Sequence, residues 1–435
     1  MAPEPDFAAH RTALLKSLAP DEAVLLLGSK HHIRNGDAEY RYRPHSDVFW
    51  LTGWEDPDVA VFLRPGDEAF TLFVQPKNKE REIWTGRRAG PDGARKQYGA
   101  DAAFPISQLA KELPRLVQGV SKLHYAFALD PDTDALLMKS ISTAARAARR
   151  NGLEVPETFH SPSRLLHELR LHKTESEVAV MREAARITGI AHRVAMADTQ
   201  PGGFEYEIAS LVDWTFKKNG GTGAGYESIV AGGANATILH YIRNRDELKD
   251  GDLLLIDAGC EYRYYTADVT RTFPVNGTFT EPQKRVYEWV LKSQLAAIEL
   301  ARTGHSFMEM HDAAIRVLTE GMVDLGLLSG DVDDLIKNDD FKKYYMHGTG
   351  HWLGLDVHDV GAYARDGGSR ALQPGMVVTV EPGLYIAADD EDAPKELRGI
   401  GIRIEDDVLV TAGEPDVLTA DIPKTVAEVE AACRA

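Results

Sequence analysis

The chain has 435 residues, of which 43% are hydrophobic and 27% are charged, a globular composition with room for one large and one small domain. Its 49 basic and 67 acidic side chains give a net charge of −18, which excludes the clustered positive charge that nucleic-acid binding requires. With two cysteines and no apolar run of signal-peptide or membrane-spanning length, we expect a cytoplasmic protein that binds no membrane and has neither a disulfide framework nor a thiolate zinc site.

The first 150 residues alternate short helical and extended patterns, which is typical of a small α/β domain. The apolar runs Val59–Leu63 and Phe70–Val74 flank the turn sequence Pro65-Gly66-Asp67 and predict a β-hairpin. Helical patterns predict helices over Ala8–Leu18, Ser107–Val117 and Asp134–Arg149.

A change of pattern between residues 155 and 174 marks the domain boundary. Pro156 and Pro162 supply loop chemistry, and Thr174 with Glu177 forms a capping-box pattern at the start of a long helix. We therefore expect an N-terminal domain at 1–172 and a second domain at 173–435.

The second domain contains a faint internal repeat. A helix from Glu175, the turn Pro201-Gly202 and a second helix from about Glu205 are followed about 100 residues later by a similar succession from Glu281, and a period of this length is too long for a solenoid repeat. Strand patterns follow each helix pair. The repeat predicts two copies of one α/β unit, related by a pseudo-two-fold axis, with a site between them.

Two acidic residues end or interrupt apolar strand patterns in the first copy. The run Gly251–Gly259 contains Asp257, and the run Thr266–Val275 contains Asp268 on the same face as Thr270. An isolated Asp is usually exposed to solvent, but two acids on neighbouring strands of a hairpin can meet at one point.

Three histidines lie in one glycine-rich stretch of the second copy. A single His is usually a structural hydrogen-bonding residue, whereas several close together favour a site. Glycines between them allow close backbone approach and unusual dihedral angles. The histidines are His347, His351 and His358, and the glycines are Gly348, Gly350 and Gly354.

Two further strand patterns each carry a glutamate. The run Gly375–Glu381 ends in its acid, and the run Gly401–Val410 places Glu405 on one face with Arg403. A surface pair of Arg403 with Glu405 would explain the second acid. An acid among core residues instead needs a metal or another cation to offset its loss of hydration.

Taken together, four carboxylates and one imidazole without sulfur form a hard donor set. Such a set suits Mn²⁺, with Co²⁺ or Zn²⁺ as alternatives, and four carboxylates match the charge of two divalent ions. The candidate metal ligands are Asp257, Asp268, His351, Glu381 and Glu405.

The same residues lie in stretches that resemble the methionine aminopeptidase, prolidase and creatinase superfamily, and most of all the bacterial aminopeptidase P family of peptidase family M24. The matching stretches are LLLIDAGCEYRYYTADVTRTFPVNG, MHGTGHWLGLDVHDVG, LQPGMVVTVEPGLYI, RGIGIRIEDDVLV and ILHYIRN, with RNGDAEYRYRPHSDVFWLTGW and EIWTGRR near the N-terminus. The resemblance implies an α/β (α+β) fold, in which a smaller mixed N-terminal domain precedes a pita-bread catalytic domain.

For the metals, the resemblance implies that Asp257 and Asp268 bind one ion and that His351 and Glu381 complete the shell of the other. Asp268 and Glu405 bridge the two, and Glu381 also serves as general base. For the substrate it implies a cleft lined by His240, His347 and His358, with Arg403, Tyr385 and Tyr226 nearby, Asp47 as a candidate for the free amine and Trp84 closing the cleft in a homo-oligomer, a dimer or tetramer.

The activity implied is that of a Xaa-Pro aminopeptidase, which releases the N-terminal residue from peptides with proline in second position. Two alternatives remain open. A prolidase cleaves Xaa-Pro dipeptides on the same fold, and some members of the superfamily are metal-free binding modules or creatinase-like hydrolases.

Overall fold

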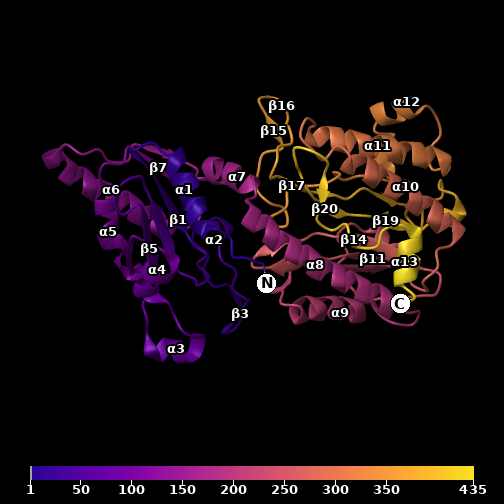
Figure 1. Ribbon diagram of the computed structural model, residues 1–435, viewed down its shortest axis with the longest axis horizontal. Coiled ribbons are helices and arrows are strands. Elements are labelled where there is room, and N and C mark those ends of the chain that lie inside the picture. Colours follow the sequence, from indigo (N-terminus) through magenta and orange to yellow (C-terminus); the bar gives the residue numbers. More distant parts are fainter. Residues whose placement is uncertain (1) are drawn as a thin grey trace. The chain divides into compact units, whose positions relative to one another are not determined.

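The computed structural model describes residues 2–435 and divides them into two compact units. Asp6–Arg170 forms the N-terminal unit, while residues 2–5 and Leu171–Ala435 form the C-terminal unit (Figure 1). The division falls two residues before the boundary expected from the sequence. None of the described helices combines the length and apolar character needed to cross a bilayer.

The N-terminal unit is built on a six-stranded sheet of order β6-β5-β4-β1-β7-β8. The predicted hairpin is confirmed, because β4 and β5 pair antiparallel, whereas β7 and β8 pair parallel. Its strands are β1 Glu22–Leu27, β4 Ala60–Leu63, β5 Phe70–Val74, β6 Ala102–Pro105, β7 Lys122–His124 and β8 Thr158–His160, with a separate hairpin of β2 Ile33–Asn35 and β3 Ala38–Glu39.

Two helices bury the apolar face of this sheet. Leu113 of α5 and Leu137 of α6 share one core cluster with Leu25 of β1, Phe62 of β4 and Phe73 of β5. All five side chains are fully buried or nearly so. The helices are α1 Phe7–Ser17, α2 Ser46–Thr52, α3 Lys79–Thr85, α4 Gly90–Tyr98, α5 Leu109–Leu116 and α6 Pro131–Asn151, and α7 Ser163–Leu171 spans the division between the units.

The C-terminal unit repeats one arrangement, a pair of helices followed by antiparallel strands. The first pair is α8 Glu175–Asp198 with α9 Glu205–Lys218, and the second is α10 Glu281–Ile298 with α11 Phe307–Asp324. Strands lie between the two helix pairs in Figure 1. The predicted capping box of Thr174 with Glu177 opens α8. Helices α12 Val332–Lys337 and α13 Val426–Ala432 complete the set.

Two three-stranded sheets, β10-β11-β14 and β17-β20-β21, correspond to the two copies of the repeat. Their strands are β10 Ile229–Gly232, β11 Leu253–Asp257, β14 Thr270–Pro274, β17 Val377–Val380, β20 Asp406–Leu409 and β21 Asp416–Val417. Shorter strands are β9 Gly223–Ala224, β12 Cys260–Tyr262, β13 Tyr265–Thr266, β15 Ala364–Arg365, β16 Gly368–Ser369, β18 Gly383–Tyr385 and β19 Gly401–Arg403.

The core of the second copy fixes the segment that carries the three histidines. Trp352, next to His351, is completely buried in one cluster with Ala297 of α10, Met310 of α11 and Val378 of β17. Thr379 N donates to His351 O over 2.9 Å, and Leu353 N donates to Val377 O over 3.0 Å, so the segment lies along β17. His351 is thus held against β17.

The three glycines of that segment differ in how much space a side chain would have. A Cβ at Gly350 would lie 1.9 Å from Thr379 O, and one at Gly354 would lie 2.2 Å from Asp359 Oδ2. At Gly348 no atom would come closer than 3.8 Å. None of the three has a positive φ, so a left-handed backbone is not what requires glycine here. Close approach to β17 is what requires glycine at position 350.

We expect Gly350→Ala to lower the free energy of unfolding by about 1–3 kcal/mol or more, because the methyl group would push the segment off β17. The matched control is Gly348→Ala, where space is open and the change should stay within about 0.5 kcal/mol. Urea unfolding of the two variants beside the parent protein measures both. Equal losses at the two positions would contradict this account.

Candidate metal centre

The ends of four strands bring four carboxylates together. Asp257 is the last residue of β11, and Asp268 lies two residues before β14. Glu381 directly follows β17, and Glu405 directly precedes β20. The antiparallel pairs β11–β14 and β17–β20 therefore each supply two acids from neighbouring strand ends. Asp268 and Glu405 are buried.

Hydroxyl groups orient two of these carboxylates. Thr270 Oγ1 donates to Glu405 Oε2 over 2.7 Å, and Thr379 Oγ1 donates to Glu381 Oε1 over 3.3 Å. Thr270 lies on the face of β14 that the alternation predicts. Thr379 carries no signal in the sequence, because its role depends on the end of β17 meeting the segment that carries His351.

His351 points its Nε2 atom toward the carboxylates. Its Nδ1 donates to Trp352 O over 3.0 Å, since a carbonyl oxygen can only accept. Nε2 lies 3.3 Å from Asp268 Oδ2 and 3.5 Å from Glu381 Oε1. One ligand atom each of Asp268, His351 and Glu405 lie within 4.8 Å of one another, a spacing suited to a metal ion.

Asp257 is held from two sides. The Tyr226 hydroxyl lies 2.6 Å from Asp257 Oδ1 and also bonds Asp268 Oδ1. Arg403 Nη2 donates to Asp257 Oδ2 over 2.5 Å. Arg403 is only 4% exposed, so the alternative of a surface pair with Glu405 is excluded.

The five candidate ligands line one cavity of about 460 Å³. His240, His347, His358, Arg403 and Tyr226 line it as well, together with Ile229, Leu239, Ile242 and Val357. The cavity therefore has an acidic floor and an apolar wall. It has the size of a small-molecule or short-peptide site.

Burial disfavours the ionised form of Asp268, Glu381 and Glu405. It raises the pKa of Glu381 to about 7, against the opposing effect of His351 and Arg403. Burial, with the neighbouring carboxylates, also raises the pKa of Asp268 and, strongly, that of Glu405. Three acids with raised pKa values in one cavity indicate a site that lacks positive charge, and divalent cations fit that need.

The other two histidines of the segment are neutral near pH 7. Burial, and then the positive charge of Arg403, lowers the pKa of His347 to about 4. Burial and His351 lower the pKa of His358, whose ring centroid lies 4.3 Å from that of His351.

A chain of hydrogen bonds engages both nitrogens of His347. Arg403 Nη1 donates to the Tyr385 hydroxyl over 3.1 Å, and that hydroxyl lies 2.8 Å from His347 Nε2. His347 Nδ1 donates to Gly348 O over 2.7 Å. A neutral imidazole has one N–H, so the ring has no further proton to donate into the cavity. Tyr385 thus lies behind the cavity wall.

His240 lies on a segment that a buried carboxylate anchors. Glu205, at the start of α9, is completely buried. It accepts from Gly232 N over 2.8 Å and from Asn235 Nδ2 over 2.9 Å on one side of His240, and from Tyr241 OH over 2.8 Å and Asp246 N over 2.9 Å on the other. Sequence analysis missed this residue, because nothing local distinguishes it from a surface glutamate on a helix.

The remaining candidates, Asp47 and Trp84, belong to the N-terminal unit. Asp47 accepts from Arg170 Nη1 over 2.7 Å and lies 3.6 Å from His167 Nε2. These contacts outweigh burial and lower the pKa of Asp47 to about 2. Trp84 of α3 is 85% exposed beside the equally exposed Ile83.

The known proteins with similar sequences match nearly the whole chain, and they agree on one family. The model of metallopeptidase family M24 matches residues 179–412, and the model of the aminopeptidase P N-terminal domain matches residues 7–125. The Xaa-Pro aminopeptidase of Escherichia coli is 42% identical over 98% of this chain and 97% of its own length. Xaa-Pro aminopeptidase 3 of Homo sapiens is 34% identical over 95% of this chain and 81% of its own.

Solved structures agree with this grouping. The Pseudomonas aeruginosa aminopeptidase PepP superposes with a TM-score of 0.96 at 47% identity, covering 99% of this chain and 98% of its own. Zinc-substituted Escherichia coli aminopeptidase P in complex with product superposes with a TM-score of 0.94 at 41% identity, covering 98% of this chain and 97% of its own. The predicted fold class is thereby confirmed.

The charge on His351 predicts a pH dependence for the metal-free protein. Although burial opposes it, contact with Asp268 and Glu381 raises the pKa of His351 to about 9. The folded state therefore keeps a proton that the unfolded state loses near pH 6.5, and stability falls as pH rises from about 6.5 to 9. Thermal unfolding of chelator-treated protein measures this trend. The raised pKa values of Glu381 and Glu405 act in the same direction, so His351→Gln should weaken this trend without abolishing it, and a parent protein that gains stability over this range would contradict the assignment.

Proposed function

The chain belongs to metallopeptidase family M24, as a metallo-aminopeptidase related to Xaa-Pro aminopeptidases, and from this premise we propose that it hydrolyses the bond between an N-terminal residue and a proline in second position. One observation carries the proposal: Asp257, Asp268, His351, Glu381 and Glu405 line one cavity of peptide-binding size. The relatives that match it over nearly their full length bear the same activity in their names.

The five side chains hold two divalent metal ions. Asp268 and Glu405 each offer a carboxylate oxygen close to His351, and His351 offers Nε2 because Nδ1 is engaged with Trp352 O. The donors are oxygen and imidazole nitrogen, which favours Mn²⁺ among the candidate ions. When bound, the ions lower the pKa of a water molecule and polarise the scissile carbonyl group.

Glu381 moves the proton in this reaction. The attacking water loses a proton to the Glu381 carboxylate, and the same carboxyl group delivers it to the prolyl nitrogen as the amide C–N bond breaks. The products are the free N-terminal amino acid and a peptide that begins with proline.

His358 and His240 stabilise the negative charge that develops on the carbonyl oxygen. Both line the cavity, and the lowered pKa of His358 keeps its ring neutral with one N–H to donate. His347 forms part of the wall that receives the proline ring. The hydrogen-bonded chain Arg403–Tyr385–His347–Gly348 fixes the orientation of the His347 imidazole. Tyr226 and Arg403 hold Asp257 in place.

Proline is selected because its amide has no N–H group. The apolar wall of Ile229, Leu239, Ile242 and Val357 offers surface for the ring and no acceptor that an amide proton would need. The free amino group of the substrate would bind at the metal centre rather than to Asp47, which already holds Arg170 and His167.

Exposed Ile83 and Trp84 on α3 favour a homo-oligomer, since a subunit contact would remove both side chains from water. Within such an assembly Trp84 closes the cleft of a neighbouring copy. Both a dimer and a tetramer contain such a subunit contact.

The activity is tested with three peptides and Mn²⁺. A tripeptide Xaa-Pro-Yaa should be cleaved at the first bond, an Xaa-Ala-Yaa control should be cleaved far more slowly, and chelation should abolish both reactions. Cleavage of an Xaa-Pro dipeptide alone would assign the chain to prolidases. Full activity after exhaustive chelation would rule out the metal mechanism.

The three histidines of the glycine-rich segment should behave differently when replaced. His351→Ala should deplete bound metal. His358→Ala should keep both ions and lower kcat about 10²–10³-fold, the usual cost of a lost oxyanion donor. His347→Ala should keep both ions and raise KM for substrates with proline in second position. Metal stoichiometry and kinetics of the three variants decide this, and loss of metal from all three would show the division of roles to be wrong.

A further inference from the structure

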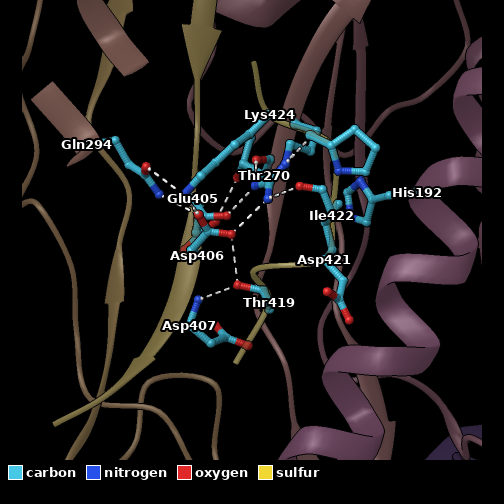
Figure 2. A network of polar contacts seen from close by, with 12 residues as sticks. His192, Thr270, Gln294, Glu405, Asp406, Asp407, Thr419, Asp421, Ile422 and Lys424 are labelled. Atoms are coloured by element: carbon cyan, nitrogen blue, oxygen red, sulfur yellow. Dashed lines mark hydrogen bonds and ion pairs between the residues drawn. The ribbon is translucent and has the colours of Figure 1, made fainter. Parts of the chain in front are cut away.

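Behind the carboxylates, a buried polar cluster joins four segments that are far apart in the sequence (Figure 2). We call it the rear cluster. Among the described residues none of its side chains lines the cavity. Its members are Arg271 of β14, Gln294 of α10, Asp406 and Asp407 of β20, and Thr419 and Lys424 of the segment after β21.

Arg271 is the centre of the rear cluster. The side chain is completely buried, and each of its five N–H groups has an acceptor. Nη1 donates to Glu405 O over 2.6 Å and to Thr270 O over 3.0 Å. The remaining bonds are Nη2 to Asp406 Oδ1 over 2.7 Å, Nη2 to Ile422 O over 3.2 Å and Nε to Pro423 O over 2.8 Å.

Asp406 ties this guanidinium to the C-terminal segment. Besides Arg271, its carboxylate accepts from Thr419 Oγ1 over 2.8 Å and from both Gln294 Nε2 and Lys424 Nζ over 2.7 Å. Two cations therefore face one buried anion. Such a network keeps one geometry only while every partner is present, because an unpaired member would be buried without compensation.

Thr419 links Asp406 to Asp407 and, through Asp407, to Asp268, the second acid assigned to both ions. Its Oγ1 accepts from Asp407 N over 3.1 Å while donating to Asp406. The Asp407 carboxylate in turn accepts from Asp268 N, at 3.2 Å from each of its oxygens. The cluster thus holds the backbone of Asp268 through Asp407 and the backbone of Glu405 through Arg271.

We propose that residues 419–424 act as a positioning segment for the metal centre, setting through the rear cluster the separation between Asp268 and Glu405. This inference rests on the proposed function, since these two acids are the ones assigned to both ions. Their carboxylates repel each other, so their backbones need an external restraint to stay at a spacing that admits two cations. Groups that orient metal ligands from behind contribute about 10–100-fold to metal affinity or activity.

A role in folding alone makes a different prediction. If the rear cluster serves folding alone, a variant that disrupts it has a lower melting temperature both with and without metal, and its metal affinity is unchanged. A positioning role weakens metal binding in protein that is still folded. Calorimetric titration of chelator-treated protein with Mn²⁺, alongside thermal unfolding, separates the two.

The test uses threonine variants of matched size. Thr419→Val removes the hydroxyl that joins Asp406 to Asp407, and Thr419→Ser keeps it. Thr319→Val is the control, because Thr319 of α11 is also fully buried, and its hydroxyl bonds only Ile315 O of its own helix among the described residues. Lys424→Met is a second probe with less risk to folding, since the Lys424 side chain is 17% exposed.

Thr419→Val and Lys424→Met are each expected to bind Mn²⁺ about 10–100-fold more weakly and to lower kcat with little change in KM. Thr419→Ser and Thr319→Val should bind like the parent. Unchanged Mn²⁺ titrations for Thr419→Val and Lys424→Met, beside a parent that binds two ions, would overturn this inference alone. A parent that binds no metal would overturn the proposed function and this inference with it.

Discussion

The C-terminal unit is organised around one electrostatic constraint, the crowding of four carboxylates in one cavity, where Asp268 and Glu405 are buried. Burial and mutual repulsion raise the pKa values of Asp268, Glu381 and Glu405. Arg403 and His351 supply only part of the missing positive charge. Such a cluster persists in a folded protein only when rigid surroundings hold it and cations balance it. The surrounding hydrogen bonds and the proposed metal ions can be understood as the two halves of that requirement.

The repeated architecture meets the first half. Each copy delivers two acids from the ends of an antiparallel pair, so the backbone of every ligand is continuous with a strand or adjacent to one. Hydroxyls of Thr270 and Thr379 then orient the carboxylates from the same strands. A site built on strand ends keeps its geometry better than one built on loops, which is what the proposed metal-dependent hydrolysis requires.

The cleft around the centre is restrained in the same manner. Arg403, Tyr385 and His347 form one hydrogen-bonded chain that ends on a backbone carbonyl, and Glu205 holds both flanks of the segment that carries His240. These contacts fix the polar residues, while the apolar wall of the cavity is left to receive the substrate. The division between rigid polar groups and an apolar surface explains how one site can combine hydrolysis with preference for a residue that lacks an amide proton.

The sequence by itself determined the local features: the hairpin around Pro65-Gly66, the capping box at Thr174, the strand that ends in Asp257 and the strand that Glu381 directly follows. These follow from turn chemistry and from a side-chain period of two, which are properties of neighbouring residues. It also contained the five candidate ligands and the motifs of their family. Only the tertiary structure decided that Arg403 binds Asp257 rather than Glu405, that Gly350 but not Gly348 has a strand against it, and that Glu205 and Arg271 are buried anchors. Each of these depends on which segments meet across the fold, and no local pattern records the partner that a buried charge will find.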